Sequence, residues 1–442
     1  MPIRPPLPRR ALAAPLLVCA LLAPAPALAG FRVDTTLDTP DAAIGDRRCE
    51  DAAGRCSLRA AIQEGNARGR AWIRLRRDTV YTLTLAGTGE DAAATGDLDV
   101  TGRIRIRGAG AVIDATGLDR IFDVHADGEL RVRRLTLTGG EAPDGEHGGA
   151  VRNTGLFDAK RSLVSDSSAP GAGGAGGGLY NDGGALRVLR STVMGNSAAE
   201  AGGGLAADGG LTVVVRSDLL ENQSGLDGGG LHATGSGELW IWRSDLADNT
   251  AARSGGGAWV GSPSDVYVYR ALFARNEAQG AATTDGGGAL YSEADVWMLS
   301  SSFSDNEASG AAGGGGGLRV AAGRLEIVGS RVEENDASDG GGGMDVSGGR
   351  AFVYYSLLGA NVAGGDGGGL RVGPGAATDV YRSHVLSNDA AGAGGGLWCS
   401  ATGTLDVDRT RIEDNGAPTG ADVFNEPPGG DFTIDGDPVA PG

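Results

Sequence analysis

The fold is decided by residues 176–196, which read GGGLYNDGGALRVLRSTVMGN. A Gly-Gly-Gly-apolar tetrad opens this segment and starts again at 202, 228, 255, 286, 315, 341, 367 and 394. Each tetrad is followed 20 or 21 residues later by an asparagine: Asn196, Asn222, Asn249, Asn276, Asn306, Asn335, Asn361, Asn388 and Asn415. A repeat of this length is typical of a solenoid.

Two apolar columns indicate that each repeat is a coil of short β-strands. The residue eight positions before the asparagine is apolar in every repeat, from Val188 to Val407, and so is the residue three positions before it, from Val193 to Ile412. Polarity alternates with a period of two around both columns, which is the pattern of strands, and the glycine at every corner disfavours helices. We expect both columns to point inward, and the asparagines to form a hydrogen-bonded ladder along the stack of coils.

The repeats resemble the coils of the right-handed parallel β-helix of the pectin-lyase-like superfold. The segments Phe273-Ala274-Arg275-Asn276 and Phe303-Ser304-Asp305-Asn306 are similar to repeats of polymorphic outer-membrane proteins. The resemblance covers roughly residues 148–415 and implies an all-β, right-handed parallel β-helix. It says much less about function, because one fold serves many functions.

Residues 1–29 are typical of a secretory signal. Arg4, Arg9 and Arg10 precede the apolar run 11–22, and Ala27-Leu28-Ala29 offers a cleavage site. The sequence therefore predicts an exported protein, secreted or at the cell surface, with no membrane span after cleavage. Removal of three arginines takes the net charge from −18 to −21, which disfavours nucleic acid and anionic membranes as partners.

Residues 30–70 depart from the repeat and are predicted to form an N-terminal helical cap. Ser57 is a plausible N-cap of an amphipathic helix that follows it. Two cysteines seven apart, Cys49 and Cys56, favour a disulfide in an exported chain over a metal pair that would lack two ligands. The segment resembles the Cys-Ser-Leu-Arg-Glu-Ala (CSLREA) domain of exported bacterial β-helix proteins, with Ala60 where the signature has Glu. A cap would cover the open end of the solenoid.

We predict that the solenoid covers residues 71–415 and begins with less regular coils. A cover or tail, residues 416–442, is expected to follow it, because prolines and glycines replace the period there. Cys399 is left unpaired, and we expect it to be a small, buried core residue rather than a reactive thiol.

Aromatic side chains are predicted to crowd the outer surface of one sheet. They occupy positions nine and seven before the asparagine and number eight of the 22 aromatic residues: Trp240, Trp242, Tyr267, Tyr269, Trp297, Phe352, Tyr354 and Tyr381. An exposed aromatic stripe favours a binding surface, and flat rings one coil apart suit a linear polysaccharide. Cross-strand packing without a ligand is the alternative.

Charged residues accompany this stripe. Six positions before the asparagine lie Arg190, Arg216, Arg243, Arg270, Arg382 and Arg409. They suit acidic sugars, or they are solvated and paired with local aspartates. In the last coils, Asp379, Asp406 and Asp408 share the outer surface and are candidate catalytic or Ca²⁺-binding carboxylates, with chance clustering as the alternative. The four histidines fall in unrelated coil positions and predict no ligand set.

Together these features predict a secreted or cell-surface scaffold that binds extracellular glycan or another surface partner without catalysis. A polysaccharide lyase or glycoside hydrolase acting on acidic polysaccharide is the second hypothesis, and a structural spacer is the third. Product formation would separate the enzyme from the other two, and glycan retention would separate the scaffold from the spacer.

Overall fold

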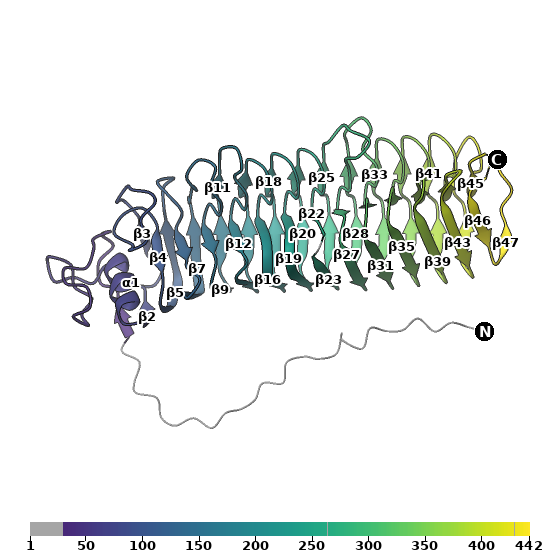
Figure 1. The fold of residues 1–442 in the computed structure, drawn as a ribbon. Helices are drawn as coiled ribbons and strands as arrows, with labels where there is room; N and C mark the ends of the chain where they lie inside the picture. The colour runs from purple at the N-terminus through teal and green to yellow at the C-terminus, as the bar shows by residue number, and fades with distance from the viewer. Residues whose placement is uncertain (1–29, 263, 428) are drawn as a thin grey trace, which may run out of the picture.

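A computed structural model describes residues 30–442, apart from positions 263 and 428. The predicted signal segment, residues 1–29, lies outside the described residues. The described chain winds into an elongated parallel β-solenoid, with successive coils running from one end of the molecule to the other (Figure 1). The all-β, parallel solenoid that the repeat predicts is confirmed.

One coil shows how the repeat folds. The glycine triad leads into β12 (Leu179–Asp182), a Gly-Gly turn leads into β13 (Ala185–Leu189), and a corner at Arg190 leads into β14 (Thr192–Met194). Asn196 then precedes β15 (Ser197–Ala198) and the next triad. In each coil, the equivalent of β12 belongs to the glycine-side face and the equivalent of β13 to the long-strand face. The equivalent of β14 belongs to the third face, and the equivalent of β15 to a short sheet.

The long-strand face carries the aromatic positions, and every pairing within it is parallel. Its strands are β5 (Arg103–Asp114), β7 (Glu129–Thr138), β9 (Leu156–Lys160), β13, β16 (Leu205–Val215), β19 (Leu231–Trp242), β23 (Asp265–Tyr269), β27 (Asp295–Leu299), β31 (Arg324–Val328), β35 (Arg350–Tyr354), β39 (Ala377–Tyr381) and β43 (Thr404–Asp408). Strands β5 and β7 continue round the next corner, and β16 and β19 begin on the glycine-side face.

The glycine-side face runs beside it. Its strands are β4 (Leu98–Val100), β6 (Phe122–Val124), β8 (Val151–Asn153), β12, the first halves of β16 and β19, β22 (Ala258–Val260), β26 (Leu290–Ser292), β30 (Leu318–Val320), β34 (Met344–Val346), β38 (Leu370–Val372), β42 (Leu397–Cys399) and β45 (Val423–Asn425).

The third face and the short sheet complete the coils. The third face holds β10 (Leu163–Ser165), β14, β17 (Asp218–Leu220), β20 (Asp245–Ala247), β24 (Leu272–Ala274), β28 (Ser302–Ser304), β32 (Arg331–Glu333), β36 (Leu357–Gly359), β40 (His384–Leu386) and β44 (Arg411–Glu413). Nine two-residue strands form the short sheet, from β11 (Ser168–Ala169) to β41 (Asp389–Ala390).

Both predicted apolar columns point into the core. The column from Val188 to Val407 is buried throughout, and so is the column that starts at Val193, except that Ile412 in the last repeat is only partly buried. The coil that begins at Gly286 differs slightly from the sequence alignment. Leu290 pairs with Ala258 and Leu318, so the equivalent tetrad starts at Gly287 rather than Gly286.

Two polar ladders hold the corners. Asn249 donates from Nδ2 to Oδ1 of Asn276 at 2.9 Å, and Asn276 donates in the same way to Asn306 at 2.8 Å. At the other corner, the N–H of Ser217 donates to Oγ of Ser244 at 3.2 Å. These side chains are buried and satisfy backbone groups that the corners would otherwise leave unpaired.

The helix α1 (Leu58–Ala67) lies at the N-terminal end and contacts β2 (Arg70–Arg74), β4 and β5 (Figure 1). The strand before it, β1 (Gly30–Arg32), pairs in parallel with β2 and so belongs to the solenoid sheet. The predicted disulfide between Cys49 and Cys56 is present. At the other end, β45 and β46 (Asp431–Ile434) continue the parallel ladder past residue 415, because their apolar residues still match the coil before them. Along the described residues, no helix has both the length and the apolar character that crossing a membrane needs.

Candidate binding face

The predicted aromatic residues lie together on the outer surface of the long-strand face. Strand pairing places Trp240 beside Tyr267 and Tyr267 beside Trp297, and the ring centroids are 4.2 Å and 5.1 Å apart. These rings are close to parallel, with interplanar angles of 19° and 12°. Their flat faces therefore contact one another rather than solvent, and much of this cluster is the cross-strand packing that sequence reasoning gave as the alternative.

Trp242 differs from these stacked rings, because it is the first aromatic residue in the column seven positions before the asparagine. Its side is bordered by Val215 in the preceding coil, and Tyr269 in the following coil meets it edge-on at 5.1 Å. The residue is 45% exposed. It lines an open groove of about 590 Å³ together with Leu189, Val215 and several basic residues. Trp242 is thus the aromatic ring of the stripe that is best placed to receive a ligand.

A second aromatic group lies four coils further along. Phe352, Tyr354 and Tyr381 contact one another at 5.9 Å and 6.3 Å, after Glu326 interrupts the column. Burial, then the charge of Asp379, raises the pKa of Tyr354. The stripe therefore consists of two clusters rather than one continuous row.

The three candidate catalytic carboxylates lie at the C-terminal end of the same surface. Asp379 and Asp406 occupy paired positions on β39 and β43, and Asp408 is paired with Tyr381. Asp379 bonds Arg350 at 2.8 Å, and Asp406 accepts a hydrogen bond from Thr433 Oγ1 at 2.6 Å. Asp408 lies 3.8 Å from Arg409. Each carboxylate thus has a neighbour of its own, and within the described chain the three do not converge on one ligand position.

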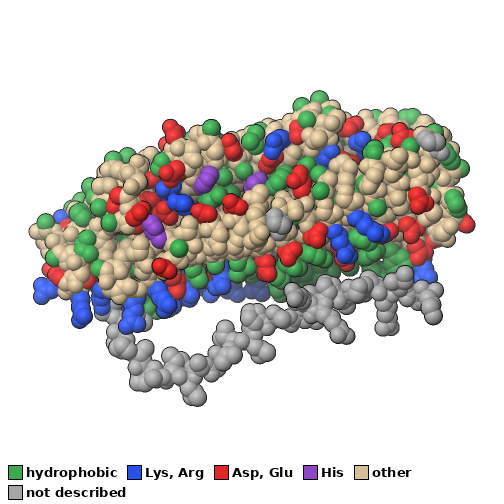
Figure 2. Space-filling model, in the orientation of Figure 1, with side chains coloured by type: hydrophobic (Ala, Val, Ile, Leu, Met, Phe, Trp, Pro, Cys, Tyr) green, Lys and Arg blue, Asp and Glu red, His purple; other side chains and the backbone are tan. Residues whose placement is uncertain are grey.

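The structure also brings together a cluster of charges that sequence reasoning missed, on the glycine-side face near the N-terminal end. Arg120 bonds Asp97 at 3.2 Å and Glu146 at 2.8 Å, and His125 bonds Asp99 at 2.8 Å. Figure 2 shows histidine side chains among acidic and basic ones on this side of the molecule. The repeat gave no signal for this cluster, because β4 and β6 belong to the less regular coils that precede the first glycine triad at 176.

Burial shifts the pKa values in this charge cluster. Burial, then the charges of Asp99 and Asp119, raises the pKa of Asp97 to about 8, although Arg120 opposes the shift. Burial also raises the pKa of Asp119 and of Asp123. The hydrogen bond of the His125 ring to the carboxylate of Asp99 raises the pKa of His125. A carboxyl group whose pKa is raised close to neutral pH occurs in general acid catalysts and also in structural ion networks.

His125, His147 and His232 all lie on this side of the solenoid, and within the described residues they do not form one ligand set. His147 stacks on Tyr180 at 4.3 Å, and His232 stacks on Trp259 at 4.6 Å. Burial lowers the pKa of His232 to about 4, so this ring is neutral at pH 7. His125, Asp91 and Asp99 bring ligand atoms within 4.8 Å of one another, which is a mixed nitrogen and oxygen donor set for a divalent metal.

Comparison of the chain with protein-family models, with curated proteins and with solved structures finds no match.

Proposed function

We propose that this chain is an exported, right-handed parallel β-helix that binds an extracellular glycan on its long-strand face without cleaving it. The observation that carries the proposal is Trp242, a half-exposed indole at the edge of an aromatic cluster, set in an open groove beside arginines. Large exposed aromatic surfaces rimmed by polar groups are typical of binding sites, and an indole face packs well on the C–H face of a sugar ring.

We propose that α1 and the disulfide loop are a cap similar to the CSLREA domain. Each residue of the Cys56-Ser57-Leu58-Arg59 run has a distinct contact that supports this. Ser57 Oγ accepts a hydrogen bond from Ala60 N at 2.9 Å, and Leu58 is buried. Arg59 is fully buried, bonds Asp38 at 2.7 Å and donates to the carbonyl of Gly96 at 2.8 Å. A disulfide suits an oxidising compartment, so a secreted or cell-surface location is part of the proposal.

The experiment measures retention and cleavage together. The chain without residues 1–29 is expressed in an oxidising compartment and incubated with neutral and acidic polysaccharides, with Ca²⁺ or with chelator. We expect retention on at least one glycan and no new chain ends. A chain that retains no glycan would be a spacer or would bind a protein instead.

Glycoside hydrolysis is a second candidate, favoured by Asp97. A carboxyl group with a pKa of about 8 stays protonated at pH 7 and can donate a proton to a glycosidic oxygen. Asp97 is 95% covered, so a substrate would have to reach it through the loops that flank β4. If the parent chain and Asp379→Asn produce new chain ends but Asp97→Asn does not, the chain is a glycoside hydrolase rather than a non-catalytic scaffold.

A further inference from the structure

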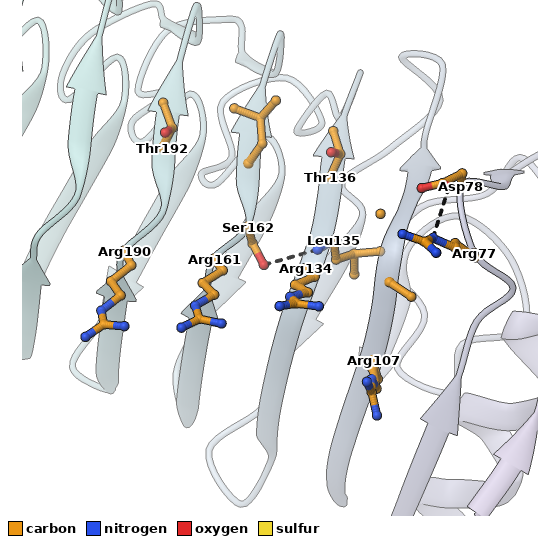
Figure 3. Close-up of a pocket in the computed structure, with 13 residues that line it drawn as sticks. Arg77, Asp78, Arg107, Arg134, Leu135, Thr136, Arg161, Ser162, Arg190 and Thr192 are labelled. Atoms are coloured by element: carbon orange, nitrogen blue, oxygen red, sulfur yellow. Dashed lines mark hydrogen bonds and ion pairs between the residues drawn. The ribbon is translucent and has the colours of Figure 1, made fainter.

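Six arginines occupy the same position in six consecutive coils, at the corner where the long-strand face ends. This arginine row consists of Arg134, Arg161, Arg190, Arg216, Arg243 and Arg270. Figure 3 shows the side chains of Arg134, Arg161 and Arg190 on neighbouring coils, pointing to the same side. Five coil spacings of about 4.8 Å give the row a length of roughly 24 Å.

The backbone at this corner does not require arginine. All six residues have φ between 51° and 53°, in the left-handed region. At the asparagine corner the same conformation is held by Glu221, Asp248, Arg275, Ala360 and Ser387, with φ from 51° to 58°. Since a left-handed corner of this fold accepts many side chains, the repeated arginine points to the guanidinium group itself.

The arginines of the row form no ion pair with a carboxylate in the described part of the chain. Among the described residues, no carboxylate lies within 4 Å of the guanidinium groups of Arg134, Arg161, Arg190, Arg216 or Arg243. By contrast, Arg275 at the other corner bonds Asp248 at 2.7 Å. Among the described residues, the alternative of pairing with local aspartates is therefore not found for these five arginines, whereas Arg409 does pair with Asp408 at 3.8 Å. Stacked like charges repel, so an anion between them would be stabilised.

The row borders two hollows that share lining residues. One, of about 760 Å³, is lined by Arg77, Arg107, Arg134, Arg161 and Arg190, and also by Asp78, which pairs with Arg77 at 3.3 Å. The other is the groove of Trp242, and it shares Arg161 and Arg190 with the first. In Figure 2, basic side chains follow the lower edge of the N-terminal half of the molecule. A straight, hollowed line of cations fits a chain-like anion better than a compact one.

We infer that the arginine row binds a linear acidic polysaccharide that carries one sulfate or carboxylate group on each sugar unit. The chain lies parallel to the solenoid axis, with its anionic groups between successive guanidinium groups and one sugar ring against Trp242. This inference rests on the proposed glycan binding and assigns its ligand class. Duplex DNA fits less well, because its phosphate strands wind through a full turn in about 34 Å and therefore diverge from a straight row of arginines.

The test compares two double variants that each remove two exposed arginines. Arg190→Gln/Arg216→Gln changes the row. Arg275→Gln/Arg331→Gln is the control, because both arginines lie at the asparagine corner or on the third face, outside the row and outside the aromatic stripe. The probes are a sulfated polysaccharide, a polyuronate, a neutral β-glucan of similar length and a single-stranded DNA oligonucleotide, each at two salt concentrations.

We expect at least one acidic polysaccharide to bind tenfold or more tightly than the neutral glucan. The row variant should lose at least tenfold of that affinity and show a shallower salt dependence, while the control changes less than twofold. The sulfated and uronate arms identify the anionic group. Equal loss in both variants, or DNA bound more tightly than both acidic chains, would overturn the inference. Equal binding of neutral and acidic glycans would also overturn it but leave the proposed function standing, whereas retention of no glycan would overturn both.

Discussion

The backbone N–H of Arg216 donates a hydrogen bond to the carbonyl of Trp242 in the next coil, at 2.9 Å. This bond fixes the register between the arginine row and the first exposed ring of the aromatic stripe. A ligand bound along the arginine row would therefore lie next to Trp242 without any movement of the backbone.

Removal of the indole should weaken glycan binding and leave the fold intact. For Trp242→Ala we expect about a tenfold loss of affinity, or about 1.4 kcal/mol, because the ring provides much of the apolar contact. Leu299→Ala is the matched control, since Leu299 is 44% exposed in the same outward column. Titration calorimetry with the retained glycan measures both. An equal effect of the two substitutions would mean that the surface contributes only general apolar area.

The asparagine ladder should be the most sensitive part of the corners. In Asn276→Ala, the carbonyl of Leu246 and the side chains of Asn249 and Asn306 lose bonds of 2.8–2.9 Å in a buried site. We expect a loss of about 3 kcal/mol or more in the free energy of unfolding, measured by urea denaturation and by amide exchange in the adjacent coils. Asp305→Asn, at an exposed left-handed position, should change it by less than about 0.5 kcal/mol.

The buried carboxyl group of Asp97 should make stability depend on pH. Its folded pKa of about 8 lies above the unfolded value of 3.8, so the folded state binds the extra proton. That contribution is complete below about pH 4 and is lost as pH rises towards 8. Asp97→Asn should therefore be increasingly more stable than the parent between pH 5 and pH 8.5, by an amount on the order of a few kcal/mol. A flat difference between Asp97→Asn and the parent over this range would contradict the buried-acid interpretation.

Counting of reactive thiols should distinguish the free Cys399 from the disulfide-bonded Cys49 and Cys56. Cys399 is fully buried, and burial raises its pKa to about 11. At pH 8 only about one thiol in a thousand would be ionised, so native protein in a Cys19→Ser background should not react with a thiol reagent. Denaturation should expose one thiol, and reduction should raise the count to three. A count of three without reductant would mean that Cys49 and Cys56 are not bonded.

The solenoid could be predicted from sequence because its determinants are local and repeated. The Val188 and Val193 columns, the glycine triads and Asn196 recur in each coil, and equivalent residues must stack when identical coils are laid on one another. The same logic places Trp240, Tyr267 and Trp297 on one surface. The sequence could not show that these rings pack face to face, since ring orientation depends on side-chain rotamers and on neighbours in other coils.

Only the tertiary structure decided where the unpaired charges lie. The sequence placed an arginine six residues before most of the asparagines, but whether an aspartate reaches each guanidinium group is a matter of distances between coils. The charge cluster of Asp97, Arg120 and His125 likewise arises from less regular coils, which the period does not align. Strand periodicity fixes which residues face outward, because backbone geometry alternates them. Burial, and with it the pKa of Asp97, is set by the whole surroundings of a side chain.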